Sequence, residues 1–133
     1  MLLQQRAAGK YHGAFLWTNA CCSHPYPGEN IEDAASRRLA EEMGFSTSLE
    51  KIFSFIYKSE VENNLIEHEF NHVFAGEYDG EINFNKREVA AYAYYDMEEI
   101  RLMLLDHPQK FTTWFKIAFP QVKAWWKKAY EVV

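Results

Sequence analysis

The run from Trp17 to Phe45 constrains the fold of this chain more than any other stretch. It reads WTNACCSHPYPGENIEDAASRRLAEEMGF. The prolines and the glycine between positions 25 and 28 cannot continue a strand and predict a loop. Asn30 is a favourable N-cap residue, and glycine at position 44 is a common residue just after a helix end. The sequence therefore predicts a loop that leads into a helix bounded by Asn30 and Gly44.

The predicted helix has two distinct faces. Apolar residues recur near helical spacing and predict a buried stripe, formed by Ile31, Ala34, Ala35, Leu39 and Met43. The other face carries two Arg–Glu pairs spaced i,i+4, each of which contributes about a few tenths of a kcal/mol to an isolated helix. These pairs are Arg37–Glu41 and Arg38–Glu42. Taken alone, this face is typical of a solvated helix surface.

The charged positions of the same stretch have the spacing of the Nudix box, a loop–helix–loop that holds a divalent metal against a diphosphate. In this chain they are Glu29, Arg37, Glu41, Glu42 and Gly44. The box of that superfamily begins with Gly and has Glu directly after the Arg, where this chain has Ser23 and Arg38. The stretch therefore resembles an altered Nudix box in which a cation replaces one carboxylate ligand.

The letters upstream of the helix narrow the resemblance. WTN followed by CCSHP is similar to type I isopentenyl-diphosphate delta-isomerase, the Nudix branch that isomerises rather than hydrolyses. The similarity runs from Leu2 to near Phe119. It implies one domain over residues 1–133 with an α/β (α+β) fold, a Nudix-type mixed β-sheet sandwiched between α-helices with additional C-terminal helices. It also implies that the chain moves a carbon–carbon double bond between isopentenyl and dimethylallyl diphosphate, a step of isoprenoid biosynthesis.

The resemblance implies two catalytic residues, Cys22 and Glu69. An unactivated alkene needs a positioned acid to become a tertiary carbocation, and a base must then remove a proton from another carbon. Two such groups on opposite sides of a dry pocket meet this need. A thiol with an ordinary pKa of about 8.5 is mostly protonated at neutral pH and can give or accept a proton. The neighbouring Cys21 is interpreted as a small buried apolar residue.

The run from Leu65 to Glu77 predicts a long strand. Alternation along it puts Glu67 and Glu69 on one face, about 7 Å apart, where two buried carboxylates need a cation or a proton between them. The resemblance implies that both bind a divalent metal, Mn²⁺, Zn²⁺ or Mg²⁺, together with His24. It further implies that Glu42 holds a Mg²⁺ ion on the substrate diphosphate.

Four further positions match substrate-binding residues of the family: Arg6, Lys10, Tyr57 and Trp114. Arg38, the cation within the altered box, is expected to bind the substrate as well. The three cations would hold diphosphate oxygens, arginine through its fork and lysine as a point charge. Tyr57 would point into the pocket, and the indole face of Trp114 would stabilise the carbocation by a cation–π interaction. Without the resemblance, the basic residues near the start of the chain would be ordinary solvated charges and the aromatic residues would be core or rim.

The net charge of −5 disfavours a nucleic-acid partner, and no apolar run approaches the ~20 residues of a membrane helix. The two cysteines are adjacent, which fits a reducing compartment. We therefore expect a cytoplasmic enzyme, a monomer or weak dimer, whose partner is a small-molecule diphosphate and not a membrane. The domain of the resembling family begins earlier, with a strand and two metal-binding histidines. We expect this chain to be N-terminally truncated relative to that family and to bind metal less tightly.

Two other functions stay open at this point. One is a Nudix hydrolase of a nucleoside diphosphate derivative, and the other is a non-catalytic protein that binds isoprenoid diphosphates. Arg38 argues against the hydrolase, because hydrolysis requires a fully occupied metal site in the box to activate water.

The rest of the chain predicts a series of shorter elements. Strands are expected over residues 1–6, 15–20, 49–57 and 88–95, with a charged loop over 58–64. Asp96 with Glu99 forms a capping box that begins a helix. Two more helices are expected over 111–119 and 121–132, separated at Pro120 because proline breaks a helix interior.

Overall fold

The computed structural model describes residues 1–10, 13–61 and 65–130, with the backbone alone for 59–61 and 65–69. The strands are β1 Leu2–Arg6, β2 Trp17–Thr18, β3 Glu50–Val61, β4 Leu65–Ala75 and β5 Val89–Tyr94. The helices are α1 Ile31–Met43, α2 Met97–Asp106 and α3 Thr113–Tyr130, with a 3₁₀ turn at Pro108–Lys110. One helix follows the first two strands and two helices follow the last strand.

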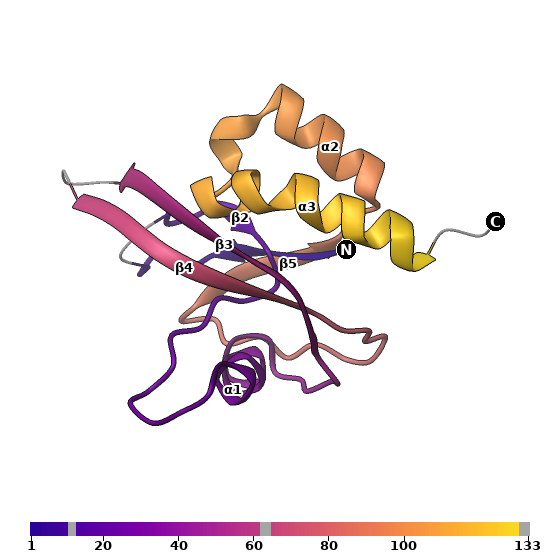
Figure 1. Ribbon diagram of the computed structural model, residues 1–133. Coiled ribbons are helices and arrows are strands. Elements are labelled where there is room, and N and C mark those ends of the chain that lie inside the picture. The colour runs from indigo at the N-terminus through magenta and orange to yellow at the C-terminus, as the bar shows by residue number, and fades with distance from the viewer. Residues whose placement is uncertain (11–12, 62–64, 131–133) are drawn as a thin grey trace.

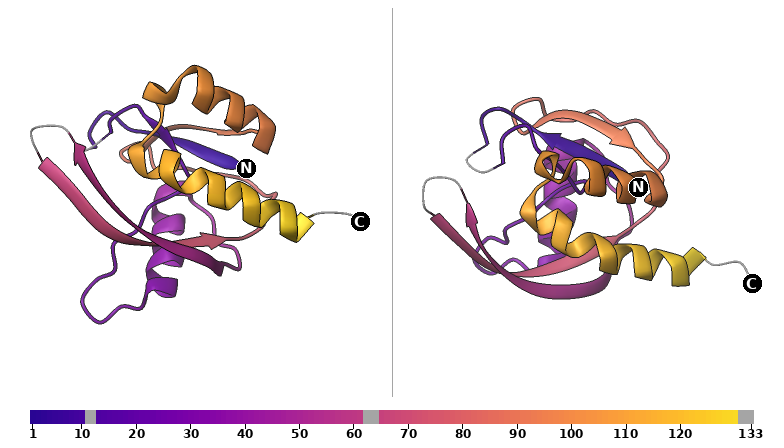
Figure 2. Two further views of the ribbon diagram at one scale, coloured as in Figure 1. Left: turned by 45° about the horizontal axis from the view of Figure 1, so that its top comes forward. Right: turned by 90° about the horizontal axis from the view of Figure 1, so that it is seen from above.

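The strands form two antiparallel units between layers of helix. One unit has the order β2-β1-β5, and the other is the β3–β4 hairpin. An isolated parallel bridge also joins Trp17 to Phe111. In Figure 1, α1 lies on one side of the strands and α2 and α3 lie on the other. The view from above separates the three-stranded unit from the hairpin (Figure 2). The predicted sandwich is confirmed.

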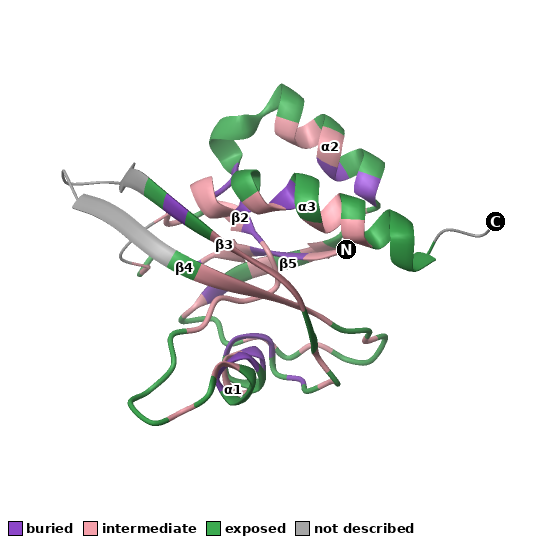
Figure 3. Ribbon diagram, viewed as in Figure 1, coloured by how far each residue is buried: buried purple, intermediate pink, exposed green. Residues whose placement is uncertain are grey.

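Strand β1 divides two hydrophobic cores because successive side chains of a strand point to opposite faces. Leu3 is fully buried in the cluster under α2 and α3, which includes Ile100 and Phe115. Its neighbour Leu2 packs against the other cluster, built around Met43 of α1. Figure 3 shows the consequence: buried residues of α1 and α3 lie on the faces toward the strands, and their outer faces are exposed.

Helix α1 has the ends that the sequence predicts. The Asn30 side chain accepts a hydrogen bond from the Asp33 amide at 2.8 Å. Gly44 has the left-handed φ of 73° and donates its amide to Ala40 O at 3.1 Å. A Cβ atom at position 44 would lie 2.1 Å from Asn83 O, so glycine is required there for space as well as for conformation.

The expectation of a solvated polar face on α1 is wrong for one residue. Glu42 is 2% exposed, whereas Glu41 one position earlier is exposed. The helix is covered on this side by β1 and by the loop before β5, so Glu42 faces protein where an isolated helix would face water. A carboxylate held this deeply needs charged or hydrogen-bonding partners.

The prediction of two helices separated at Pro120 is also wrong. Helix α3 is continuous from Thr113 to Tyr130 with Pro120 inside it. Proline removes one backbone hydrogen bond, but Phe115 and Phe119 on the same helix are 2% and 3% exposed in the core. Burial of such aromatic side chains contributes about 2 kcal/mol or more each, which offsets the local cost of the proline.

Other boundaries differ from the predicted ones. The expected loop at 58–64 is wrong for residues 58–61, because β3 continues to Val61. Residues 62–64 lie outside the described part. Strand β2 is only two residues long, shorter than the expected 15–20. Among the described helices, none has both the length and the apolar character needed to cross a membrane.

Candidate active site

Cys22 lies in the loop after β2, beside Asn19 of the same loop and near Trp114 from a distant part of the chain. Asn19 Nδ2 lies 3.8 Å from Cys22 Sγ. The same side chain accepts a hydrogen bond from Trp114 Nε1 at 3.3 Å. The thiol and the indole therefore share one polar neighbour. Trp114 belongs to the first turn of α3, so this contact depends on the packing of α3 against β2.

The thiol of Cys22 is held in its protonated form at neutral pH. Burial raises its pKa, and the negative charge of Glu42 raises it further. The positive charge of Arg6 and hydrogen bonds from Asn19 and Trp114 act in the opposite direction but are outweighed, so the pKa rises to about 11.

Cys21 has different surroundings although it is the next residue. Its side chain packs against the α1 core cluster with Met43 and Val89. Burial raises the pKa of its thiol, and the nearby Cys22 and Glu42 raise it further. The structure describes both cysteines as free thiols. The two residues thus point to different environments, one toward polar groups and one into the core.

Arg6 reaches Trp114 from the end of β1. Pairing between β1 and β5 changes register between Gln5 and Arg6, a bulge that redirects the strand end. The guanidinium carbon of Arg6 lies 5.2 Å from the centre of the Trp114 ring. This distance is within the range of a cation–π contact. The predicted phosphate-binding arginine and the predicted pocket tryptophan are therefore neighbours.

A compact ionic cluster surrounds Glu42, whose charge acts on Cys22. Arg38 Nη2 contacts Glu42 Oε1 at 3.1 Å and Glu88 Oε1 at 2.7 Å. Lys10 Nζ lies 3.2 Å from Glu88 Oε1 and 3.9 Å from Glu42 Oε2. Burial works against ionisation of Glu88, but the hydrogen bonds from Arg38 and Lys10 prevail and its pKa is lowered. Arg38 also contacts the exposed Glu41 at 2.5 Å, so the two cations of this cluster share several carboxylates.

Gln4 supports Glu42 from behind. It is 1% exposed, and its Nε2 donates to Glu42 Oε2 at 3.2 Å and to Ala20 O at 2.5 Å. Glu42 is a hard oxygen donor of the kind that Mg²⁺ prefers, and its contacts leave some of its roughly four lone-pair positions free. The chemistry of this carboxylate therefore fits the implied Mg²⁺ ion.

Arg37 connects the loop before α1 to the exposed face of that helix. Its guanidinium donates to both carboxylate oxygens of Glu29, at 2.9 and 3.0 Å, and to Glu41 at 3.0 Å. It also stacks over the ring of Tyr26 at 3.9 Å and donates to the backbone oxygen of His24 at 3.2 Å. These contacts fold the loop back onto α1. The His24 side chain is exposed on that loop.

The side chains of Glu67 and Glu69 lie outside the described residues. The backbone of β4 places Glu69 opposite Tyr57 and Glu67 opposite Ser59 in the hairpin. Tyr57 is 5% exposed. Within the part of the chain whose side chains are described, no three His, Cys, Asp or Glu residues are grouped closely enough to hold a metal. The second metal site thus stays a prediction.

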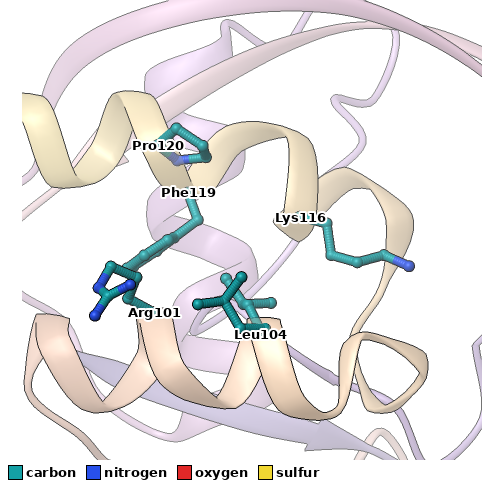
Figure 4. Close-up of a pocket in the computed structure, with 6 residues that line it drawn as sticks. Arg101, Leu104, Lys116, Phe119 and Pro120 are labelled. Atoms are coloured by element: carbon teal, nitrogen blue, oxygen red, sulfur yellow. The ribbon is translucent and has the colours of Figure 1, made fainter.

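An open apolar groove of about 330 Å³ lies between α2 and α3, away from the residues predicted for the site. Figure 4 shows Phe119 of α3 extending toward α2, with Arg101 and Leu104 beside it. Lys116 and Pro120 also line this groove. None of the predicted catalytic or binding residues lines it, so the groove does not coincide with the thiol site.

Three residues with close contacts to the site were not singled out from the sequence: Gln4, Asn19 and Glu88. Asn19 carried a signal, since it is the last letter of the WTN run. Glu88 begins the strand predicted over 88–95 and looked like an ordinary strand end. Gln4 lay inside the first predicted strand, where nothing local distinguishes a buried glutamine from an exposed one.

Comparison with known proteins gives consistent matches. The family model described as NUDIX domain matches residues 1–115. A Photorhabdus laumondii protein named isopentenyl-diphosphate Delta-isomerase 2 is 46% identical over 130 residues, which cover 94% of this chain and 73% of that protein. A Pectobacterium atrosepticum protein named isopentenyl-diphosphate Delta-isomerase is 44% identical over 127 residues, covering 96% of this chain and 71% of that protein.

Solved structures with similar folds are more distant in sequence. The crystal structure of a MutT protein from Methanosarcina mazei Go1 superposes with a TM-score of 0.75 at 16% identity. The match covers 98% of this chain and 85% of that one. At this level of identity the likeness concerns the fold alone.

Proposed function

Because the chain belongs to the Nudix family and, within it, to the isopentenyl-diphosphate Delta-isomerases, we propose that it interconverts isopentenyl and dimethylallyl diphosphate. The observation that carries the proposal is the position of Cys22. Its thiol has Asn19 as a polar neighbour, Asn19 also binds the Trp114 indole, and the charge of Glu42 acts on the thiol. A proton donor, an aromatic face and cations for a diphosphate adjoin one another.

The proposed reaction uses two proton transfers. One group adds a proton to the terminal carbon of the double bond, and the positive charge then rests on the tertiary carbon. The other group removes a proton from the carbon on the far side of that centre, and the double bond forms in its new position. Cys22 and Glu69 are the proposed pair. Because the reaction is reversible, each acts as acid in one direction and as base in the other.

The Trp114 ring is proposed to face the carbocation. An indole face attracts a cation through its quadrupole, by about 2 kcal/mol or more in a dry site. Arg6 already uses one such contact with this ring. Tyr57, buried on the neighbouring hairpin, is proposed to form another part of the pocket wall. Exclusion of water by these side chains would protect the carbocation from capture.

The diphosphate is proposed to bind to Arg6, Lys10 and Arg38. A Mg²⁺ ion held by Glu42 would neutralise part of the diphosphate charge, and His24, Glu67 and Glu69 would hold a second divalent ion. Lys10 and Arg38 are paired with Glu88 in the described structure. An incoming diphosphate therefore has to share or replace these carboxylate contacts.

The test is turnover of isopentenyl diphosphate, followed by NMR of the product in the presence of Mg²⁺ and Mn²⁺. Cys22→Ala should abolish turnover, a loss of about 10²-fold or more for a proton-transfer group. The matched variant Cys21→Ala should keep most of it, because Cys21 packs in the core cluster.

Equal losses from the two cysteine variants would mean that the thiol is misassigned. Absence of isomerisation in the wild-type protein, with release of a nucleotide from nucleoside diphosphate derivatives under the same conditions, would replace the proposal by the hydrolase. Binding of the isoprenoid diphosphate without turnover of either substrate would replace it by the non-catalytic alternative.

A further inference from the structure

Asn19 occupies a position between the thiol and the indole that the proposed reaction leaves unexplained. Its Oδ1 accepts hydrogen bonds from Thr18 Oγ1 at 2.8 Å and from Trp114 Nε1 at 3.3 Å. Its Nδ2 lies 2.5 Å from Cys21 O and 3.8 Å from Cys22 Sγ. One short side chain thus contacts four residues from β2, the thiol loop and α3.

These neighbours determine which way the amide group of Asn19 points. An indole N–H only donates and a backbone carbonyl only accepts. If the amide were rotated by 180°, its NH₂ would face the Trp114 N–H and its oxygen would face Cys21 O. Both contacts would then be repulsive. The NH₂ group therefore faces Cys22.

This orientation has a consequence for the thiol of Cys22. The Sγ atom lies at nearly the same distance from both polar atoms of the amide, 3.8 Å from Nδ2 and 3.9 Å from Oδ1. Both lone pairs of that oxygen are already used by Thr18 and Trp114. The sulfur therefore accepts a hydrogen bond from Nδ2, and the S–H hydrogen stays available to a substrate.

The frame that holds Asn19 is buried and neutral. Thr18 and Thr112 are 0% and 1% exposed, and their hydroxyls are 2.9 Å apart. Thr112 also accepts from the amide of Phe115 at 3.3 Å, at the start of α3. The chain segment before Asn19 is thereby fixed to the helix that carries Trp114. Such a satisfied network holds one arrangement of its members.

We propose that Asn19 is a positioning residue of the isomerase, and that its amide group sets the direction of the Cys22 thiol relative to the Trp114 ring. The inference rests on the proposed function of Cys22. Asn19 itself does not touch the reacting atoms; it acts by holding the group that does. Misplacement of a catalytic group by about 1 Å can cost on the order of 10²-fold in rate.

The kinetic test is Asn19→Asp. A carboxylate can still accept from Thr18 and Trp114, but it has no NH₂ group for Cys21 O and Cys22 Sγ. We expect kcat to fall about 10- to 100-fold with KM changed less than about twofold. The melting temperature should fall modestly, because a carboxylate oxygen then faces Cys21 O. The control is Asn30→Asp, the same chemical change at an exposed helix cap that only accepts a hydrogen bond. Its kcat and KM should stay at the wild-type values.

A second measurement needs neither turnover nor a variant of Asn19 that folds. The side-chain NH₂ resonances of Asn19 in ¹⁵N NMR should shift when the sulfur is removed by Cys22→Ala. Cys21→Ala should shift them less, since Cys21 contributes only its backbone oxygen.

Two kinetic outcomes would overturn the inference. One is an unchanged kcat, and the other is a fall in kcat with a KM altered to a similar degree, which indicates a merely structural role. Unchanged chemical shifts of the Asn19 NH₂ group in the Cys22→Ala variant would overturn it as well. If the wild-type protein fails to isomerise, the proposed function fails, while the NMR result reports the contact between Asn19 and Cys22 on its own.

Discussion

The two sides of Cys22 are built in opposite ways. On the side of α3, neutral hydrogen bonds run from the Thr112 and Thr18 hydroxyls through Asn19 to Trp114. On the side of α1, charged groups share partners: Arg38 contacts three carboxylates, those of Glu41, Glu42 and Glu88, and Glu88 contacts two cations.

This difference indicates that one side of the site fixes the geometry of the thiol and the other side binds the diphosphate. Neutral, fully matched hydrogen bonds hold one geometry whether or not a ligand is present. Ion pairs that share partners can exchange a carboxylate for a phosphate oxygen without leaving a charge unpaired. We therefore expect changes on the neutral side to affect kcat and changes on the ionic side to affect KM and stability.

The largest expected effect on the ionic side comes from Arg38→Met. Removal of the guanidinium leaves the buried Glu42 without its main cation, while Gln4 and Lys10 still contact it. Loss of one partner of a buried pair costs about 3 kcal/mol in unfolding free energy. Urea denaturation measures this cost, and KM for the diphosphate should rise as well.

The matched control for Arg38 is Arg101→Met, which removes an arginine from an exposed pair with Glu98. Its unfolding midpoint should move very little, because exposed ion pairs contribute little to stability. If the two arginine variants lost similar stability, the ionic side would not be the buried network described above.

A smaller effect is expected from Thr112→Val on the neutral side. The substitution removes the hydroxyl that accepts from the Phe115 amide and pairs with Thr18. The loss of a helix cap and of one buried hydrogen bond amounts to about 2 kcal/mol. Because Thr18 then loses its anchor on α3, kcat should fall more than KM changes.

Thr47→Val provides the comparison for Thr112, since the Thr47 hydroxyl bonds a backbone oxygen at an exposed position. Steady-state kinetics of both variants would show whether the effect on kcat depends on the place of the threonine or on the Thr→Val change itself. A Thr112 variant with raised KM and normal kcat would contradict the division between the two sides.

The smallest effect is the pH dependence of Glu88→Gln. The pKa of Glu88 is lowered in the folded protein, so its carboxylate stabilises the fold above the unfolded-state pKa of about 4.3. That stabilisation is lost as the pH falls through this value toward the lower folded pKa. The difference in unfolding free energy between wild type and Glu88→Gln should therefore be largest near neutral pH and shrink on acidification.

Glu81→Gln, at an exposed loop position, serves as the reference for the acid titration of Glu88. Its stability difference from wild type should stay small at every pH. A Glu88 variant whose stability difference grew in acid would show that the carboxylate is not stabilised by its two cations.

Local patterns carried most of the successful predictions. The ends of α1 depend on Asn30 and Gly44, and the start of α2 depends on the Asp96–Glu99 capping box; both are formed as expected. A cap involves residues within one turn, so its residues stand together in the sequence. Pro120 shows the limit of such rules, because its effect on α3 was decided by the burial of Phe115 and Phe119 elsewhere on the helix.

The residues of the site could be predicted only in part, because some of them meet through contacts between distant parts of the chain. The sequence by itself determined the family, the thiol motif and the two-faced helix, since motif spacing and helical period are properties of neighbouring residues. Only the tertiary structure decided that Glu42 is buried, that Glu88 joins Arg38 across 50 positions, and that Asn19 meets Trp114 across 95. Contacts of this kind exist only after β1, α1 and α3 have packed, and no local pattern encodes them.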